Sequence, residues 1–158
     1  IYSNMTDKFK ITVALKVPEG IDPDTEVRGT IEINSTVLEE FAIKQNTTQQ
    51  FEHEIDLDEG EHILTVNNNF SPDPKTACVI EKITFDDIDL GIIAYSGEYR
   101  PDYPEPWYSD ECAAGRTPKE VWGGKDSQDG STPMFMGWEG SYKLKFYTPL
   151  YEWLLEHL

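Results

Sequence analysis

The sequence has few histidines, few cysteines and no long hydrophobic run, and each shortage excludes a class of protein. No apolar stretch approaches the roughly 18 residues that a membrane-spanning helix needs. The two cysteines, Cys78 and Cys112, allow at most one disulfide and form no CxxC metal pattern, so the chain is not a disulfide scaffold. Of the three histidines, His53 and His62 stand in strand-like patterns, where a packed histidine is more common than a catalytic base.

Basic residues are also scarce. Lys and Arg total 13 against 30 Asp and Glu, which gives the chain a formal charge of −17. This excess of negative charge repels the phosphates of nucleic acids and of anionic membranes, so we expect neither as a partner. An aromatic content of 12% argues against an acidic disordered tail. With 158 residues, the chain is long enough to bury one hydrophobic core of its own.

The first 95 residues show the alternation of apolar and polar residues that is typical of half-buried strands. Polar turns separate these segments, and no helical period interrupts them. This pattern favours an all-β, two-sheet antiparallel sandwich over a parallel α/β sheet. We expect strands over residues 9–17, 27–33, 37–43, 51–57, 63–66, 78–85 and 88–95.

The character of the sequence changes after residue 96. We interpret residues 5–96 as the sandwich core and residues 97–140, which are rich in proline, glycine and aromatics, as a long ordered loop excursion. Residues 141–158 then supply a final strand and a C-terminal arm. Thr148 and Pro149 suit the N-cap and first position of a short terminal helix. All three segments belong to a single domain.

Tyrosine and tryptophan are concentrated in this later part of the chain. Their flat rings stack on sugars and anchor protein interfaces. An equally simple interpretation is that the rings pack against one another and hold the loop down. The residues that we predict to contact a glycan or a partner are Tyr99, Tyr103, Trp107, Tyr108, Trp122, Trp138 and Trp153.

Clusters of carboxylates suggest one further kind of site. Asp86, Asp87 and Asp89 gather at a turn between two expected strands, and Asp73 lies in the preceding loop. Ca²⁺ takes 6–8 oxygen ligands, which loops at the rim of a sandwich can supply. These four residues are therefore the candidate metal ligands, although acidic turns that only solvate the surface give the same pattern. The sequence contains no P-loop, dinucleotide fingerprint or G-x-S-x-G elbow, so we do not expect an enzyme.

Two parts of the sequence resemble known families. Residues 59–70 (GEHILTVNNNF within that range) and 79–91 (VIEKITFDDIDLG) resemble the second half of small jelly-roll modules, the calcium-dependent xylan-binding carbohydrate-binding modules. Residues 99–104 (YRPDYP) and the C-terminal part from residue 137 (GWEGSY, then YEWLLE) are similar to virion proteins of tailed phages that infect cyanobacteria.

These resemblances imply a jelly-roll scaffold and a non-catalytic structural module of the virion, either a capsid decoration or a tail or fibre component. The implied location is the surface of the particle. The implied partners are other virion proteins or further copies of this chain, and a cell-surface polysaccharide is a further candidate partner. The alternative is a calcium-assisted glycan-binding module that is attached to or serves a hydrolase. The virion module requires no cofactor, whereas the glycan-binding module would use calcium.

Overall fold

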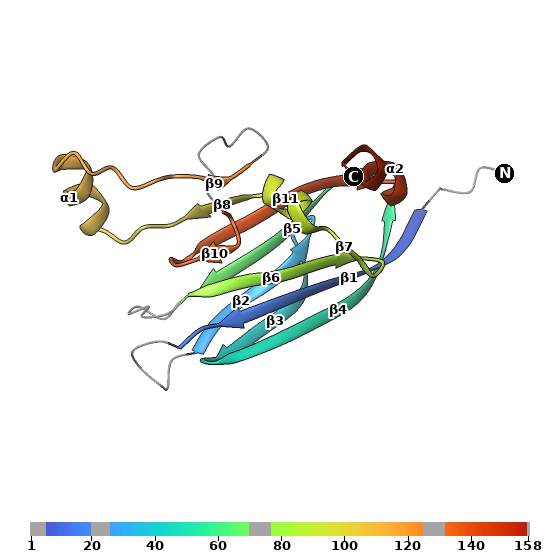
Figure 1. Ribbon diagram of the computed structural model, residues 1–158, viewed down its shortest axis with the longest axis horizontal. Coiled ribbons are helices and arrows are strands. Elements are labelled where there is room, and N and C mark those ends of the chain that lie inside the picture. The colour runs from blue at the N-terminus through green and yellow to red at the C-terminus, as the bar shows by residue number, and fades with distance from the viewer. Residues whose placement is uncertain (1–5, 20–25, 70–76, 125–131, 158) are drawn as a thin grey trace.

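Two antiparallel β-sheets face each other and enclose a single hydrophobic core in the computed structural model of this chain (Figure 1). The structure describes residues 6–19, 26–69, 77–124 and 132–157. This arrangement confirms the predicted all-β, two-sheet antiparallel sandwich. No helix in these described ranges is both long enough and apolar enough to cross a membrane.

The first sheet, sheet A, has the strand order β10-β6-β1-β4, and the short strand β7 pairs with β6. Its central strand β1 pairs with β4 along its whole length, from Thr6 opposite Asp58 to Val17 opposite Thr47. Strand β4 therefore forms one edge of sheet A. The strands of this sheet are β1 (Thr6–Val17), β4 (Thr47–Asp58), β6 (Cys78–Phe85), β7 (Ile88–Asp89) and β10 (Phe135–Met136).

The second sheet, sheet B, has the strand order β3-β2-β5-β11-β8-β9. Its two central strands, β5 and β11, pair with each other from Asn68 opposite Gly140 to Gly60 opposite Thr148. The strands are β2 (Glu26–Ile33), β3 (Thr36–Lys44), β5 (Gly60–Asn69), β8 (Glu98–Pro101), β9 (Trp122–Gly123) and β11 (Gly140–Thr148).

The alternation in the sequence becomes the two faces of each strand, because successive side chains of a strand point to opposite sides of the sheet. On β1 the inward side chains are at most 3% exposed, and they are Phe9, Ile11, Val13, Leu15 and Val17. The rings of Phe9, Phe85 and Phe146 meet across the two sheets, with centroids 5.0–6.1 Å apart. The apolar stripes of both sheets thus form one continuous core.

The prediction of a single strand over residues 88–95 is wrong. Only β7 forms there, and a 3₁₀ helix, η1 (Gly91–Ser96), follows it. Gly91 has a φ of +55°, in the left-handed region that glycine enters at little cost, and this ends the strand. In the helix Ile93 and Ala94 are buried while Ile92 is 82% exposed, so the apolar run does not follow the two-residue period of a strand.

Residues 97–140, predicted as a loop excursion, contribute short strands to both sheets. Strand β8 pairs with β11 in sheet B, and β10 pairs with β6 in sheet A. The part that departs from the sandwich is residues 102–121. We call this segment the arm; it is distinct from the C-terminal arm expected within residues 141–158, which forms helix α2 (Leu150–His157). The arm carries helix α1 (Trp107–Ala113) and projects at one end of the elongated molecule (Figure 1). At the opposite end, β11 leads into helix α2.

A polar clasp joins the β2–β3 turn, the β4–β5 turn and the end of β11. The backbone N–H of Ile63 donates to Asn34 Oδ1 (2.9 Å), so the Asn34 amide nitrogen faces His62 Nδ1 and donates to it (2.8 Å). His62 Nε2 is then the N–H donor to the carbonyl of Asp58 (2.7 Å). The Thr148 hydroxyl donates to the same carbonyl (2.8 Å). This network ties three chain segments together through His62 and Thr148, which are 8% and 2% exposed.

Candidate functional site

Four aromatic rings meet where the arm leaves the sandwich, and we call them the aromatic cluster: Tyr103, Trp107, Tyr108 and Trp138. The ring of Tyr103 lies 5.6 Å from that of Trp107, 5.6 Å from that of Tyr108 and 5.5 Å from that of Trp138. Trp107 and Trp138 are closer still, at 4.9 Å. Trp138 comes from the β10–β11 connection, so the cluster attaches the arm to the sandwich.

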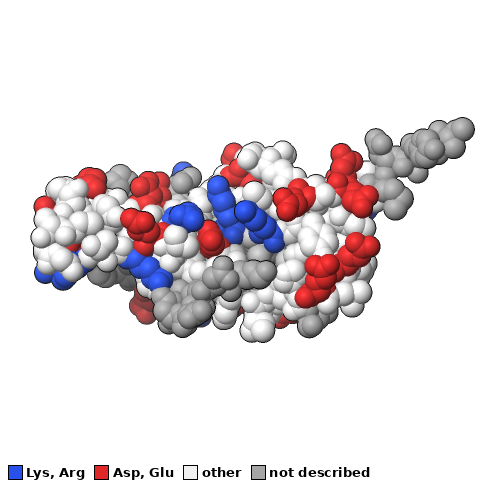
Figure 2. Space-filling model, turned by 90° about the horizontal axis from the view of Figure 1, so that it is seen from above, with Lys and Arg blue, Asp and Glu red and all other residues white. Residues whose placement is uncertain are grey.

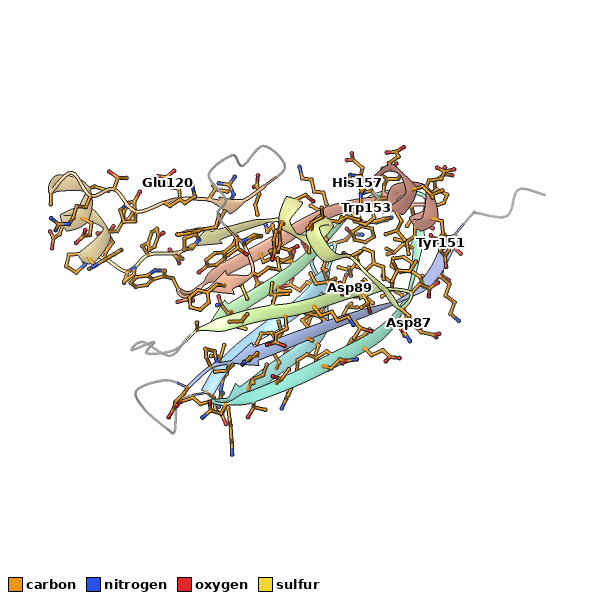
Figure 3. All side chains as sticks on the ribbon, viewed as in Figure 1. Asp87, Asp89, Glu120, Tyr151, Trp153 and His157 are labelled. Carbon is orange, nitrogen blue, oxygen red and sulfur yellow. The ribbon has the colours of Figure 1, made fainter. Side chains whose placement is uncertain are left out.

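Hydrogen bonds hold the returning half of the arm against this cluster. The Tyr103 hydroxyl donates to the backbone carbonyl of Lys119. The Tyr108 hydroxyl donates to Glu120 Oε1 (3.0 Å), and the bond to this carboxylate raises the pKa of Tyr108 to about 12. Glu120 lies on the arm, far from α2 (Figure 3). The outgoing and returning halves of the arm are therefore tied together by side chains from the cluster itself.

Helix α1 has no buried side chain and is stabilised by polar contacts on the surface. The Ser109 hydroxyl donates to Glu105 Oε2 (2.6 Å) at the start of the helix. The guanidinium of Arg116 pairs with Glu111 (2.8 Å) beyond its end and lowers the pKa of that carboxyl. Trp107 remains 38% exposed. The arm thus presents an exposed aromatic side chain from a locally ordered helix.

Two predicted contact residues, Tyr99 and Trp153, lie in the core instead of on the surface. Tyr99 is 1% exposed, and its oxygen accepts a hydrogen bond from the backbone N–H of Trp138 (3.1 Å). With Tyr142, whose hydroxyl donates to the Ala94 carbonyl (2.6 Å), it forms a pair that we call the core tyrosines. Burial raises the pKa of both phenols. These hydroxyls serve the packing of η1 and the β10–β11 connection.

Trp153 is the anchor of helix α2. It is 3% exposed, and its ring centroid lies 5.8 Å from that of Phe85 and 6.1 Å from that of Phe146. In Figure 3 its label stands where α2 meets the sandwich, at the end opposite to the arm. Trp122, on β9, is partly buried and packs against the core, with the ammonium of Lys119 5.9 Å from its ring centroid. The seven predicted aromatics therefore occupy three different environments.

Of the candidate metal ligands, Asp86 and Asp87 form the β6–β7 turn, and both have positive φ angles, 54° and 64°. Asp86 Oδ2 accepts a hydrogen bond from the hydroxyl of Tyr151 on α2 (2.7 Å). Asp87 Oδ1 lies 2.8 Å from Lys10 Nζ, and this contact raises the pKa of Lys10. Both carboxylates thus already have partners within the protein.

The remaining candidate ligands give no cluster in the described part of the chain. Asp89 Oδ1 accepts the backbone N–H of Gly91 (2.9 Å), the first residue of η1. Asp73 lies outside the described residues. Among the side chains that the structure describes, no three of His, Cys, Asp or Glu are grouped to hold a metal ion. The calcium site remains a prediction.

Charge is unevenly spread over the face seen from above the sandwich. In Figure 2, Lys and Arg side chains gather near the middle of that face, while groups of Asp and Glu lie toward both ends. On this side the α2 end shows groups of Asp and Glu, while the arm end shows both acidic and basic side chains. Three exposed aromatics were not among the predicted contacts: Tyr95 on η1 (49% exposed), Phe135 on β10 (54%) and Tyr151 on α2 (55%). The neighbours of Phe135, Pro133 and Gly137, indicate a loop, and no sequence signal sets this ring apart.

Comparison with known protein families, with curated proteins and with solved structures finds no match to this chain.

Proposed function

We propose that this chain is a non-catalytic structural module of a phage virion, a capsid decoration or a tail or fibre component. Its scaffold would be a jelly roll like that of the carbohydrate-binding modules. The observation that carries the proposal is the arm: an ordered projection held by its own aromatic cluster, with Trp107 38% exposed. The placement of two elements further supports a role in assembly. The arm and α2 lie at opposite ends of the elongated sandwich, which suits contacts on both sides (Figure 1).

The physical argument rests on the cost of ordering a contact surface. Interfaces depend on a few aromatic and arginine anchors, and a loop that must be ordered on binding loses affinity. In the arm that ordering is already present, because Tyr103 contacts both halves of the arm and also Trp138. The net charge of −17 keeps such a surface soluble and disfavours unspecific association.

Sedimentation velocity over a range of protein concentrations tests this proposal. We expect the wild type to form an oligomer, and we expect Trp107→Ala to shift it toward monomer without changing the far-UV circular dichroism spectrum. Ile92→Ala is the matched control, since Ile92 is 82% exposed on η1, away from the arm. A wild type that stays monomeric, or an equal effect of both variants, contradicts assembly through the arm.

Glycan binding is a second candidate, favoured by the exposed ring of Trp107 on the arm, which also carries the exposed residues Asp102 and Glu105. Sugar recognition combines an aromatic platform with polar groups of this kind. Affinity electrophoresis against a panel of polysaccharides should then show retardation that Trp107→Ala abolishes. Calcium assistance predicts a higher Tm in millimolar Ca²⁺. An unchanged Tm removes calcium, and no retardation on any polysaccharide removes the glycan.

A further inference from the structure

The outer edge of β4 is a long strand edge with no partner in the described part of the chain. Strand β4 has 12 residues and pairs only with β1, so it closes sheet A on that side (Figure 1, lowest strand). Strands typically have about 5–6 residues, and native edge strands are usually kept short because their unpaired N–H and C=O groups accept other strands. An edge of this length offers several successive backbone hydrogen-bonding positions.

Three of the four inward side chains of β4 from residue 51 to 57 are only partly covered. Phe51 and Leu57 are half-buried although they pack against the core, whereas Val13 of β1, opposite Phe51, is 1% exposed. The fourth, Ile55, is buried. His53 lies in the same row. Its Nε2 atom is buried without a hydrogen-bond partner, 3.6 Å from Glu39 Oε1. One more strand beside β4 would cover this row and complete the core at this edge.

The outward side chains of β4 define the chemistry of such a strand. Glu52, Glu54 and Asp56 follow one another on this face, and all three are exposed. In an antiparallel pair, opposite charges on facing residues stabilise the pairing and like charges weaken it. The incoming strand should therefore place cations opposite these carboxylates.

Strand β1, on the other side of β4, already has this pattern. Lys8 Nζ lies 3.9 Å from Glu54, and Lys10 Nζ lies 3.6 Å from Glu52, while Phe9 between the two lysines points into the core. The native neighbour of β4 thus alternates lysine with apolar residues. A strand on the outer edge meets the same two rows of β4 side chains and needs the same alternation.

We propose that the outer edge of β4 binds an extended segment of a partner protein in which Lys or Arg alternates with apolar residues. Such strand addition supplies affinity through main-chain hydrogen bonds and specificity through alternate side chains. A second copy of β4 does not fit, because its own carboxylates would then face Glu52, Glu54 and Asp56. The acidic row therefore excludes edge-to-edge pairing of identical chains and admits a basic strand.

Three labelled peptides test the pattern: Lys-Phe-Lys-Ile-Lys-Val, the same residues in the order Lys-Lys-Lys-Phe-Ile-Val, and Glu-Phe-Glu-Ile-Glu-Val. We expect fluorescence anisotropy to show binding of the alternating basic peptide, weaker binding of the block peptide and none of the acidic peptide. Higher salt should weaken the binding of the first, because the charge pairs are exposed. Equal binding of the two basic peptides overturns the proposal, since charge alone would then explain it.

A variant of β4 with a matched control tests the site. In E52Q/E54Q/D56N we expect binding of the alternating peptide to weaken by about tenfold, from the loss of three cross-strand charge pairs. The control E40Q/E61Q/E139Q changes the net charge equally at exposed positions outside β4 and should bind like the wild type. Equal weakening in both variants contradicts a site on β4.

Hydrogen exchange locates the contact independently of affinity. The bound peptide should slow amide exchange within residues 47–58 and leave residues 36–44 of β3, the edge strand of sheet B, unchanged. Protection on the arm or on β3 instead of on β4 overturns the proposal. Because the peptide assay needs neither a particle nor self-association, its outcome is independent of the assembly role proposed for the arm.

Discussion

Replacing Trp153 by alanine should remove the main attachment of helix α2. A buried tryptophan removes roughly 200 Å² from water, which at about 25 cal/mol per Å² gives about 5 kcal/mol. Trp153 is 3% exposed and contacts the rings of Phe85 and Phe146, so nearly all of this burial is lost. We expect Trp153→Ala to lower the free energy of unfolding by about 3–5 kcal/mol. Leu150 and Leu154, the other buried residues of this eight-residue helix, are then left to hold it against the sandwich.

Urea unfolding followed by far-UV circular dichroism measures this loss. Leu155→Ala is the control on the same helix, because Leu155 is 75% exposed and its removal should change the free energy of unfolding by less than about 0.5 kcal/mol. The Tm of Trp153→Ala should fall by about 10 °C or more. A loss below about 1 kcal/mol for Trp153→Ala, or equal losses for both variants, refutes the assignment of Trp153 as the anchor.

Three further predictions concern the thiols, the core tyrosines and the polar clasp. Burial raises the pKa of the Cys78 thiol to about 12, so an aromatic disulfide reagent should titrate only half-exposed Cys112 in the native protein and both thiols in urea. The core tyrosines have raised pKa values, so the native state keeps these protons when the unfolded chain loses them. Stability in urea should therefore be complete below about pH 10 and should fall as the pH rises further. Asn34→Gly keeps the positive φ but removes two hydrogen bonds of the polar clasp, which should lower the free energy of unfolding by about 1–3 kcal/mol. Asn46→Gly, in the exposed β3–β4 turn with a φ of 58°, should change it little in the same assay.

The strands could be predicted because their pattern is local. On β1 each large apolar residue from Phe9 to Val17 stands two positions from the next, and the structure buries every one of them. The segment 88–95 misled for a physical reason. Its apolar residues form a contiguous run from Ile92 to Tyr95, and such a run does not distinguish a strand from a short helix, so the outcome depended on the backbone of Gly91.

The contact residues were harder to predict, because their environments depend on residues far apart in the sequence. Trp138 joins Tyr103 and Trp107 only because β11 returns beside β8, which brings the two connections together. Tyr99 and Trp153 are a tyrosine and a tryptophan like the members of the aromatic cluster, but their side chains face inward. The local sequence does not distinguish these two residues from the exposed ones. The concentration of aromatic residues after residue 96 thus predicted that this part of the chain is ordered. It did not predict which of these aromatic side chains are exposed and which are buried.

The attachment of α2 also determines how the molecule would respond to tension. The backbone N–H of Leu150 donates to Asp7 Oδ2 (2.6 Å), so the start of β1 and the start of α2 are in direct contact. These elements continue into central strands of opposite sheets, β1 in sheet A and β11 in sheet B. A force applied at Thr6 and His157 would first separate α2 from the rings of Phe85 and Phe146 and then separate the sheets from that end. Separating α2 breaks contacts one after another, so the helix acts as a mechanical release that yields before the sandwich does.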